Sequence, residues 1–101
     1  MIGVFVRLGP SDGLDHARAT TVAEQAIPMF EGMPGLRSKA MTWDEEKGIV
    51  TNLYIWETEE AARAFHTPEL AAMIVDLYGT EPKVSFVEIT ALIDNGVTSS
   101  V

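Results

Sequence analysis

The chain has 101 residues, enough for one domain, and 47% of them are hydrophobic, which excludes intrinsic disorder as its main state. The 7 basic and 15 acidic residues give a formal net charge of -8, which suits neither nucleic acid nor an anionic lipid surface. The chain has no cysteine, so disulfides, thiolate metal sites and cysteine nucleophiles are excluded. The apolar N-terminal run breaks at Arg7, too early for a signal core or a membrane span, and we expect a cytoplasmic protein.

The first predicted elements are a strand and a helix. Residues 2–8 place β-branched and aliphatic side chains at alternate positions, and a Gly-Pro pair ends the run, which is typical of a strand. Ser11 or Asp12 can cap the helix that follows. Pro28 is expected to end or kink that helix near Ile27, because proline lacks the N–H that a helix interior needs.

The middle of the chain predicts a β-hairpin. A dense Gly-Pro-Gly turn signal precedes residues 36–44, which alternate again, and residues 49–57 alternate between two largely apolar faces. The polar run 44–48 connects them and ends in Gly48, which suits a position of positive φ in a hairpin.

Two short helical segments come next. Thr58 is a good N-cap for a helix that continues to His66. Thr67, with Pro68 at the first helical position, begins a second segment that Gly79 stops.

The C-terminal part completes the predicted fold. Residues 84–93 are expected to form the last strand, and 94–101 a polar tail outside a single domain of residues 1–93. The order β-α-β-β-α-β is that of the ferredoxin-like α+β fold, a four-stranded antiparallel sheet with helices on one face. Because residues 49–57 are apolar on both faces, the uncovered face would expose more apolar surface than a monomer tolerates. We therefore predict a homodimer that pairs sheet to sheet.

Asn52, Tyr54 and Trp56 stand out as candidate functional residues. They alternate along one predicted strand, so their side chains point into the same space. If that face looks toward the helices, the three line a pocket. The alternative is structural: Tyr54 and Trp56 are core aromatics whose polar tips lie at an edge. The residues alone leave both interpretations open.

Other polar residues carry weaker signals. His66 is a candidate general base near pH 7, although a histidine at a helix end is more often solvated and favoured by the helix dipole. Arg7, Arg37 and Lys39 could steer an anionic substrate or pair with the abundant carboxylates, and pairing is favoured. The sequence has no Gly-rich phosphate loop and no paired histidines, so we predict no metal site and no bound cofactor.

Four short motifs follow one another between residues 33 and 66. They are a Pro-Gly turn before a strand, a strand that ends in Trp-Glu, a Thr-capped Glu-Glu-Ala helix and a closing histidine: Met33-Pro34-Gly35-Leu36, Tyr54-Ile55-Trp56-Glu57, Thr58-Glu59-Glu60-Ala61 and His66. In this pattern the chain resembles the antibiotic-biosynthesis-monooxygenase superfamily, whose members are dimeric α/β barrels. With the late Tyr78-Gly79, it is most similar to the small YdhR-type monooxygenases of that superfamily.

The resemblance implies a homodimer whose sheets pack face to face, with a ligand pocket between each sheet and its own helices. It also implies oxidation of a polyphenol, anthrone or quinol to a quinone by O₂, without a cofactor because the substrate is the reductant. Asn52 would hold the substrate oxygen, Trp56 would shape or stack on the ring, and His66 would be the base. The residues expected to bind the substrate are Tyr54, Phe65 and Met73.

Other functions stay open at this point. One is a non-oxidative isomerase or cyclase reaction on a polyketide-like substrate, and another is a non-catalytic dimer that binds a small aromatic ligand, since one fold hosts many functions. Haem degradation is a further option within the superfamily, but an acidic protein is poorly suited to bind the anionic haem propionates. The predicted partners are a second copy of the chain and a small aromatic molecule, and neither nucleic acid nor membrane.

Overall fold

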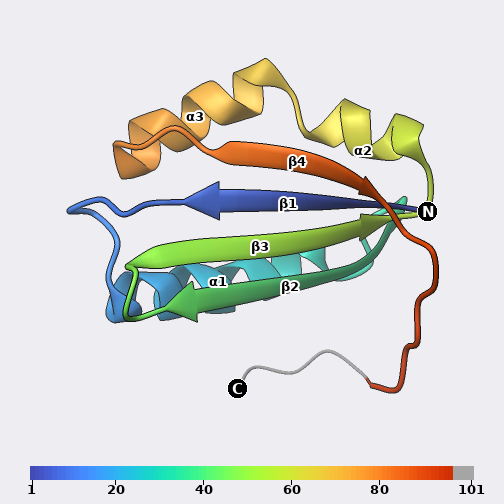
Figure 1. Cartoon of the computed structure of the whole chain (residues 1–101), viewed down its shortest axis with the longest axis horizontal. Coiled ribbons are helices and arrows are strands. Elements are labelled where there is room, and N and C mark those ends of the chain that lie inside the picture. Colours follow the sequence, from blue (N-terminus) through green and yellow to red (C-terminus); the bar gives the residue numbers. More distant parts are fainter. Residues whose placement is uncertain (97–101) are drawn as a thin grey trace.

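A computed structural model describes residues 1–96 of the chain (Figure 1). These residues form four strands and three helices in the order βαββααβ. Their bounds are β1 (Ile2–Leu8), α1 (His16–Phe30), β2 (Leu36–Asp44), β3 (Ile49–Trp56), α2 (Glu59–Phe65), α3 (Pro68–Tyr78) and β4 (Lys83–Glu88).

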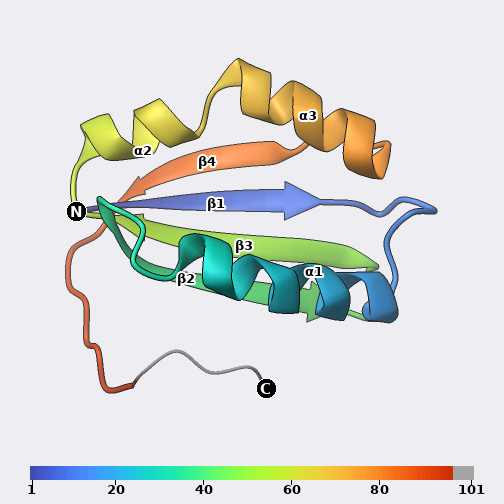
Figure 2. The same cartoon turned by 180° about the vertical axis from the view of Figure 1, so that it is seen from behind.

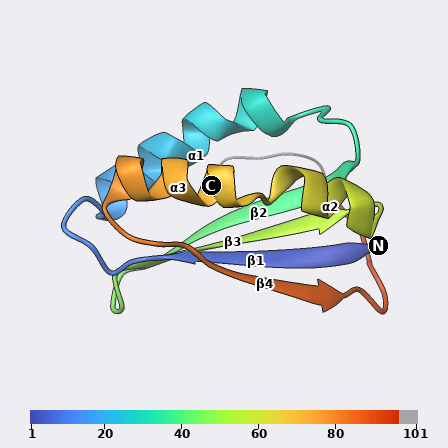
Figure 3. The ribbon, with the colours of Figure 1, turned by 90° about the horizontal axis from the view of Figure 1, so that it is seen from above.

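The strands form one antiparallel sheet in the order β2-β3-β1-β4. Val4 of the central strand β1 lies opposite Tyr54 of β3 on one side and Phe86 of β4 on the other. Helices α1, α2 and α3 all lie on one face of this sheet (Figure 3). The predicted ferredoxin-like α+β fold is confirmed, and we call the face toward the helices the inner face and the opposite one the outer face.

The last strand is shorter than predicted. The sequence indicated a strand over 84–93, whereas β4 ends at Glu88. Glu88 pairs with Ile2, the first residue of β1, so beyond this point the neighbouring strand has run out. One further bond joins the Ile89 N–H to the carbonyl oxygen of Met1, at 3.4 Å. The length of β4 is therefore set by its partner and not by its own alternation.

Helix α1 begins later than predicted. Neither Ser11 nor Asp12 is its N-cap; the Leu14 N–H donates to the carbonyl of Ser11 at 3.1 Å, so these residues form a turn. Asp15 caps the helix instead, and its carboxylate accepts the N–H of Arg18 at 2.8 Å. That bond satisfies one of the free N–H groups that every helix start leaves.

Helix α1 also continues past the proline that was expected to stop it. Pro28 lies inside the helix, which ends at Phe30. Because Pro28 is in the last turn, its missing N–H removes one bond only, and the N–H of Glu31 closes the turn on the carbonyl of Ile27 at 2.9 Å.

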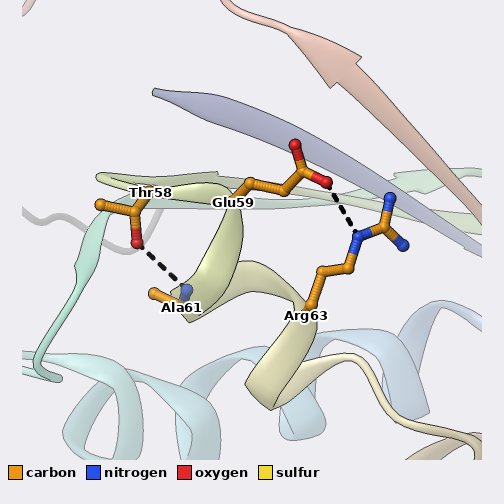
Figure 4. Close-up of polar contacts among 4 residues, drawn as sticks. All are labelled: Thr58, Glu59, Ala61 and Arg63. Carbon is orange, nitrogen blue, oxygen red and sulfur yellow. Dashed lines mark hydrogen bonds and ion pairs between the residues drawn. The ribbon is translucent and has the colours of Figure 1, made fainter.

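The second helical region divides in two, as predicted, and each part has a threonine cap. Figure 4 shows the start of α2, where the Thr58 hydroxyl oxygen accepts the N–H of Ala61 at 3.1 Å and the exposed Arg63 pairs with Glu59 at 3.0 Å. Thr67 caps α3 in the same way, at 3.2 Å. The two helices therefore begin independently and can differ in how closely they pack.

Helices α2 and α3 differ in how closely they pack on the sheet, and this difference leaves space for the site. The core of the molecule lies under α2, where Ala62 packs with the buried Val4 and Trp56 of the sheet. Helix α3, in contrast, contains no buried residue. On the other side of the inner face, α1 crosses β2 and β3 (Figure 2). The space between α1, α3 and the sheet is where a cavity remains.

Within residues 1–96, no helix lies on the outer face. Phe5 and Leu53 are paired across β1 and β3 there, next to Ile55. After β4 the chain crosses the end of the sheet toward β2 (Figure 1), where Asp94 lies 3.3 Å from Arg37. Of the predicted tail 94–101, the last five residues lie outside the described part of the chain.

Candidate functional site

A cavity of about 530 Å³ lies between the inner face of the sheet and helices α1 and α3. Aliphatic and aromatic side chains make up most of its lining, including Val6 of β1, Ala26 of α1 and Ile74 of α3. Polar side chains enter it from β2, β3 and α1. A space of this size, mostly apolar with a few polar groups, is typical of a site for a small organic molecule.

Two buried polar atoms on the cavity wall have no partner. The amide oxygen Oδ1 of Asn52 and the indole Nε1 of Trp43 make no hydrogen bond within residues 1–96. Asn52 lies opposite Met41, and Trp43 opposite Val50, so the two side chains are diagonal neighbours on β3 and β2. A buried polar atom left unpaired costs roughly 1–3 kcal/mol. A ligand that accepts from Trp43 and donates to Asn52 would remove that cost.

Tyr54 lies next to them at the aromatic end of the cavity. It is 7% exposed, and its ring lies 6.0 Å from Phe30, 6.2 Å from Trp56 and 5.7 Å from Phe65 between centroids. Burial, with a smaller effect of Tyr78, raises the pKa of Tyr54 to about 12. Its hydroxyl is therefore neutral at pH 7 and available as a hydrogen-bond donor.

Trp56 and His66 form a pair behind Tyr54. Trp56 is 2% exposed, and its indole N–H donates to Nε2 of His66 at 3.0 Å. The His66 ring lies edge-on to Tyr54, with 4.6 Å between centroids. Burial, with a smaller effect of the Lys39 charge, lowers the pKa of His66 to about 4. His66 is therefore neutral at pH 7, and its accepting nitrogen is already used.

Lys39 enters the cavity from β2. Its Nζ lies 3.4 Å from the ring centroid of Phe30 and 4.5 Å from that of Tyr54, so the ammonium contacts two aromatic faces. Burial lowers the pKa of Lys39 to about 8. Of the three basic strand residues expected to pair with carboxylates, Arg37 does so, whereas Lys39 and Arg7 have no such partner within residues 1–96. For Lys39 the favoured prediction was wrong: its ammonium lies against the Phe30 and Tyr54 rings, and no aspartate or glutamate of residues 1–96 lines the cavity that it enters.

The predicted site residues fall into three groups. Asn52, Tyr54 and Phe65 line the cavity. Trp56 and His66 lie beside it and contact its lining without being part of it. In this conformation neither the indole N–H of Trp56 nor Nε2 of His66 is free to meet a ligand.

Met73 lies apart from the other predicted residues. Its side chain is 53% exposed, and it is not part of the cavity lining. The face of α3 that lines the cavity consists of Leu70, Ile74, Leu77 and Tyr78. Met73 lies one position beyond this stripe, and helical spacing alone did not separate it from the stripe.

The sequence analysis missed Trp43 as a site residue and, for Lys39, favoured pairing with a carboxylate over contact with an anionic substrate. A signal was present, since the alternation of residues 36–44 places both on the same face. What was missing is the register: pairing of β2 with β3 sets which β2 residues lie beside Asn52, and a bulge between Leu36 and Ser38 shifts that register.

Within residues 1–96, no group of three His, Asp or Glu side chains lies close enough together to hold a metal ion. None of the helices there has the length and apolar character needed to cross a membrane.

Comparison with known proteins finds likeness in structure only. No protein-family model and no curated protein matches the chain. NE2512, a protein of unknown function from Nitrosomonas europaea, matches with a TM-score of 0.71 and 19% identity over 95% of both chains. The monooxygenase ActVA-Orf6 of Streptomyces coelicolor, solved with nanaomycin D, matches with a TM-score of 0.64 and 24% identity over 94% of this chain and 92% of that one. SnoaB, a cofactor-independent oxygenase from Streptomyces nogalater, matches with a TM-score of 0.60 and 13% identity over 93% of this chain and 97% of that one.

The chain has the fold of these monooxygenases. Each match spans nearly the whole of both chains, so the likeness concerns the complete arrangement of sheet and helices. The same fold belongs to a protein of unknown function, and a fold hosts more than one reaction. The shared fold therefore does not by itself establish the function.

Proposed function

We propose that the protein is a cofactor-independent monooxygenase of the antibiotic-biosynthesis type that oxidises a flat phenolic compound, such as an anthrone or quinol, to a quinone with O₂. The observation that carries this proposal is the cavity itself: a mostly apolar space with the unpartnered polar atoms of Asn52 and Trp43 on one wall. The fold shared with ActVA-Orf6 and SnoaB supports it. On the Pro-Gly and Tyr78-Gly79 motifs we place the chain near the YdhR-type members.

The proposed reaction balances with the substrate as the reductant. Loss of a proton from the ring CH₂ of an anthrone gives a carbanion that is delocalised onto the ring oxygen. One electron passes to O₂, and the resulting radical pair joins to form a C–O bond. The peroxide anion that results takes up the proton lost in the first step and becomes a hydroperoxide. Loss of the remaining C–H proton breaks the O–O bond and releases hydroxide, which takes up that proton, leaving a second carbonyl. One oxygen atom ends in the quinone and the other in water.

The cavity residues suit the first of these steps. Asn52 can accept a hydrogen bond from a phenol through Oδ1 and donate to the developing oxyanion through its amide nitrogen. The indole N–H of Trp43 is a second donor, and the neutral Tyr54 hydroxyl a third. Phe30 and Phe65 supply apolar contact for a flat ring.

Trp56 and His66 have a supporting role in this proposal. Their hydrogen bond holds the wall against which Tyr54 lies. We do not assign the base to His66, because Trp56 occupies its accepting nitrogen and its pKa of about 4 makes it a weak proton acceptor.

We also propose that the protein acts as a homodimer formed through the outer face. Phe5 and Leu53 lie side by side there, and no helix of residues 1–96 covers them. A second copy of the chain, placed sheet to sheet, would bury this surface in a symmetric interface. The arrangement is the dimeric α/β barrel that the sequence resemblance implied.

A second candidate is a protein that binds an aromatic compound without converting it. The observation in its favour is that His66, the expected base, is occupied by Trp56 and does not line the cavity. Both candidates predict that an aromatic compound binds in the cavity, and only the monooxygenase predicts that it is converted.

The test is conversion of anthrone by wild-type protein and two variants. Asn52→Leu removes the polar atoms on the cavity wall at similar volume, and Asn95→Leu makes the same change at an exposed position of the C-terminal segment. We expect kcat/KM for quinone formation to fall about 100-fold in Asn52→Leu, the usual effect of losing an oxyanion donor, and to stay unchanged in Asn95→Leu. Equal rates in all three proteins would overturn the assignment of Asn52. Saturable binding with no quinone in any of them would favour the binding protein.

A further inference from the structure

The charges that line the cavity have the opposite sign to the protein as a whole. The chain carries a formal net charge of -8. The charged side chains among the lining residues are Arg18 and Lys39, and no aspartate or glutamate of residues 1–96 lines the cavity. The carboxylates of this acidic protein therefore lie outside the cavity.

Lys39 is the cation among them that lies deepest. Arg18 is exposed and stacks on Tyr78, with 5.5 Å from its Cζ to the ring centroid. The Lys39 ammonium is half-buried between Phe30 and Tyr54 and has no carboxylate within 4 Å in the described chain. Burying a charge without a counter-ion is costly, and two aromatic faces recover only part of that cost.

The position of Lys39 completes a row of polar groups along the cavity wall. Lys39 lies opposite Tyr54 and Trp43 opposite Val50, with Asn52 between these points. Four residues along a strand span about 13 Å. A flat ring compound lying along β2 can therefore reach the Asn52 and Trp43 atoms with one part and the ammonium of Lys39 with another.

From this arrangement we propose that the cavity selects ring compounds that carry a negative charge, as a carboxylate or an ionised phenol, and that Lys39 is their counter-ion. The inference rests on the proposed function for the position of the ligand and adds the charge of the substrate. The selection is local. Surface charges act weakly beyond the screening length of about 8 Å at physiological ionic strength, and those of this protein repel anions.

The experiment compares two probes that differ in charge and hardly in shape. Calorimetric titration with 2-naphthoate and with the neutral 2-naphthamide is made on wild-type protein, Lys39→Met, Lys39→Arg and Lys47→Met. Methionine keeps most of the length of the lysine side chain and removes its charge. Lys47 is an exposed residue of the β2–β3 connection, so Lys47→Met makes the same change in net charge away from the cavity.

We expect wild-type protein to bind 2-naphthoate about 10-fold more tightly than 2-naphthamide. Lys39→Met should lose this preference through weaker naphthoate binding, with naphthamide binding unchanged. Unchanged naphthamide binding also shows that the variant is folded with its cavity intact. Lys39→Arg and Lys47→Met should both keep the preference.

Each other outcome overturns a defined part of the account. Equal affinity of the wild-type protein for the two probes, or an equal loss of both in Lys39→Met, overturns the inference and leaves the oxygenase proposal standing. Failure of both probes to bind overturns the two together. A naphthoate preference that depends on Lys39, in a protein that does not oxidise anthrone, supports the inference and overturns the proposed reaction.

Discussion

At the scale of single residues, the hydrogen bond from Trp56 to His66 requires an unprotonated Nε2. The pKa of His66 is lowered to about 4 in the folded protein, from an ordinary value of 6.5. As the pH falls below 6.5, the unfolded chain takes up a proton at this residue and the folded protein does not. The free energy of unfolding therefore decreases as the pH falls from about 6.5 to about 4, and this contribution stays constant below that.

We predict that His66→Gln has a flatter dependence of stability on pH than the wild type. Glutamine retains an acceptor for the Trp56 N–H and does not titrate. Urea denaturation at pH 7 and pH 4.5 measures the difference, and His16→Gln, at the exposed first residue of α1, should behave like the wild type. Because all three proteins share the same carboxylates, equal slopes in His66→Gln and wild type would contradict the pairing of His66 with Trp56.

Lys39 gives a second pH prediction, now for binding. Its pKa of about 8 means that it is charged at pH 6.5 and largely neutral at pH 9.5, while an aromatic carboxylate with a pKa of about 4 stays ionised throughout. Affinity for 2-naphthoate should fall as the pH rises through 8, and affinity for 2-naphthamide should not. Tyr54 and His66, which face Lys39, have pKa values of about 12 and 4, outside this range. The other titratable or charged groups around the cavity are His16, Arg18 and Tyr78.

The same titration on Lys39→Met separates Lys39 from these other groups. The variant should bind 2-naphthoate with an affinity that does not change between pH 6.5 and pH 9.5. A fall in the variant as large as that in the wild type would assign the pH dependence to another cavity residue.

At the scale of the elements, α3 forms one side of the cavity and is held mainly at its ends. Thr67 caps its first turn, and the carbonyl of Tyr78 in its last turn accepts the Ser11 hydroxyl at 2.9 Å. Between them Leu70, Ile74 and Leu77 line the cavity, and no residue of the helix is fully buried. The helix therefore depends more on its caps than on packing.

We predict that Thr67→Ala lowers the free energy of unfolding by about 1 kcal/mol, the usual cost of losing a threonine cap, and weakens binding of 2-naphthamide. Thr58→Ala removes the matching cap on α2, which contributes Phe65 alone to the cavity lining, so it should cost as much stability with little loss of affinity. Urea denaturation and calorimetry measure the two effects. A similar loss of affinity in both variants would contradict the assignment of α3 as the helix that encloses the ligand.

The bounds of the helices and strands also show which features of the fold the sequence alone predicts. The bounds of β1, β2 and α3 follow from local signals: alternation bounded by turns, and the Thr67-Pro68 start. The end of β4 was wrong because it depends on where β1 runs out. The start of α1 was wrong because two acceptable caps precede Asp15 and lie in a turn.

The site residues also divide into those that local alternation predicts and those that depend on strand register or packing. Asn52 and Tyr54 could be predicted because their alternation places them on one face of one strand. Trp43 and Lys39 became site residues through strand register, which a single sequence does not reveal. That His66 meets Trp56 depends on how α2 lies over the sheet, and this is a property of packing rather than of sequence spacing.

At the scale of the whole molecule, the outer face should hold two copies together. We expect sedimentation to give twice the chain mass of 11.0 kDa at micromolar concentration. Leu53→Asp, in the centre of the outer face opposite Phe5, should shift the protein to single chains, because a buried charge without a partner is costly. Val75→Asp, on an exposed position of α3, should leave the dimer intact. Single chains in the wild type would contradict the sheet-to-sheet dimer.

The central claim is that the substrate and the side chains of this cavity suffice for oxidation by O₂. The most direct test is oxygen uptake by protein that has been freed of metal with a chelator and then given anthrone. The account predicts uptake faster than in buffer, with one O₂ consumed for each anthrone that becomes anthraquinone, and loss of the added rate in Asn52→Leu. Uptake equal to that in buffer, by protein that still binds naphthalene ligands in its cavity, would contradict it.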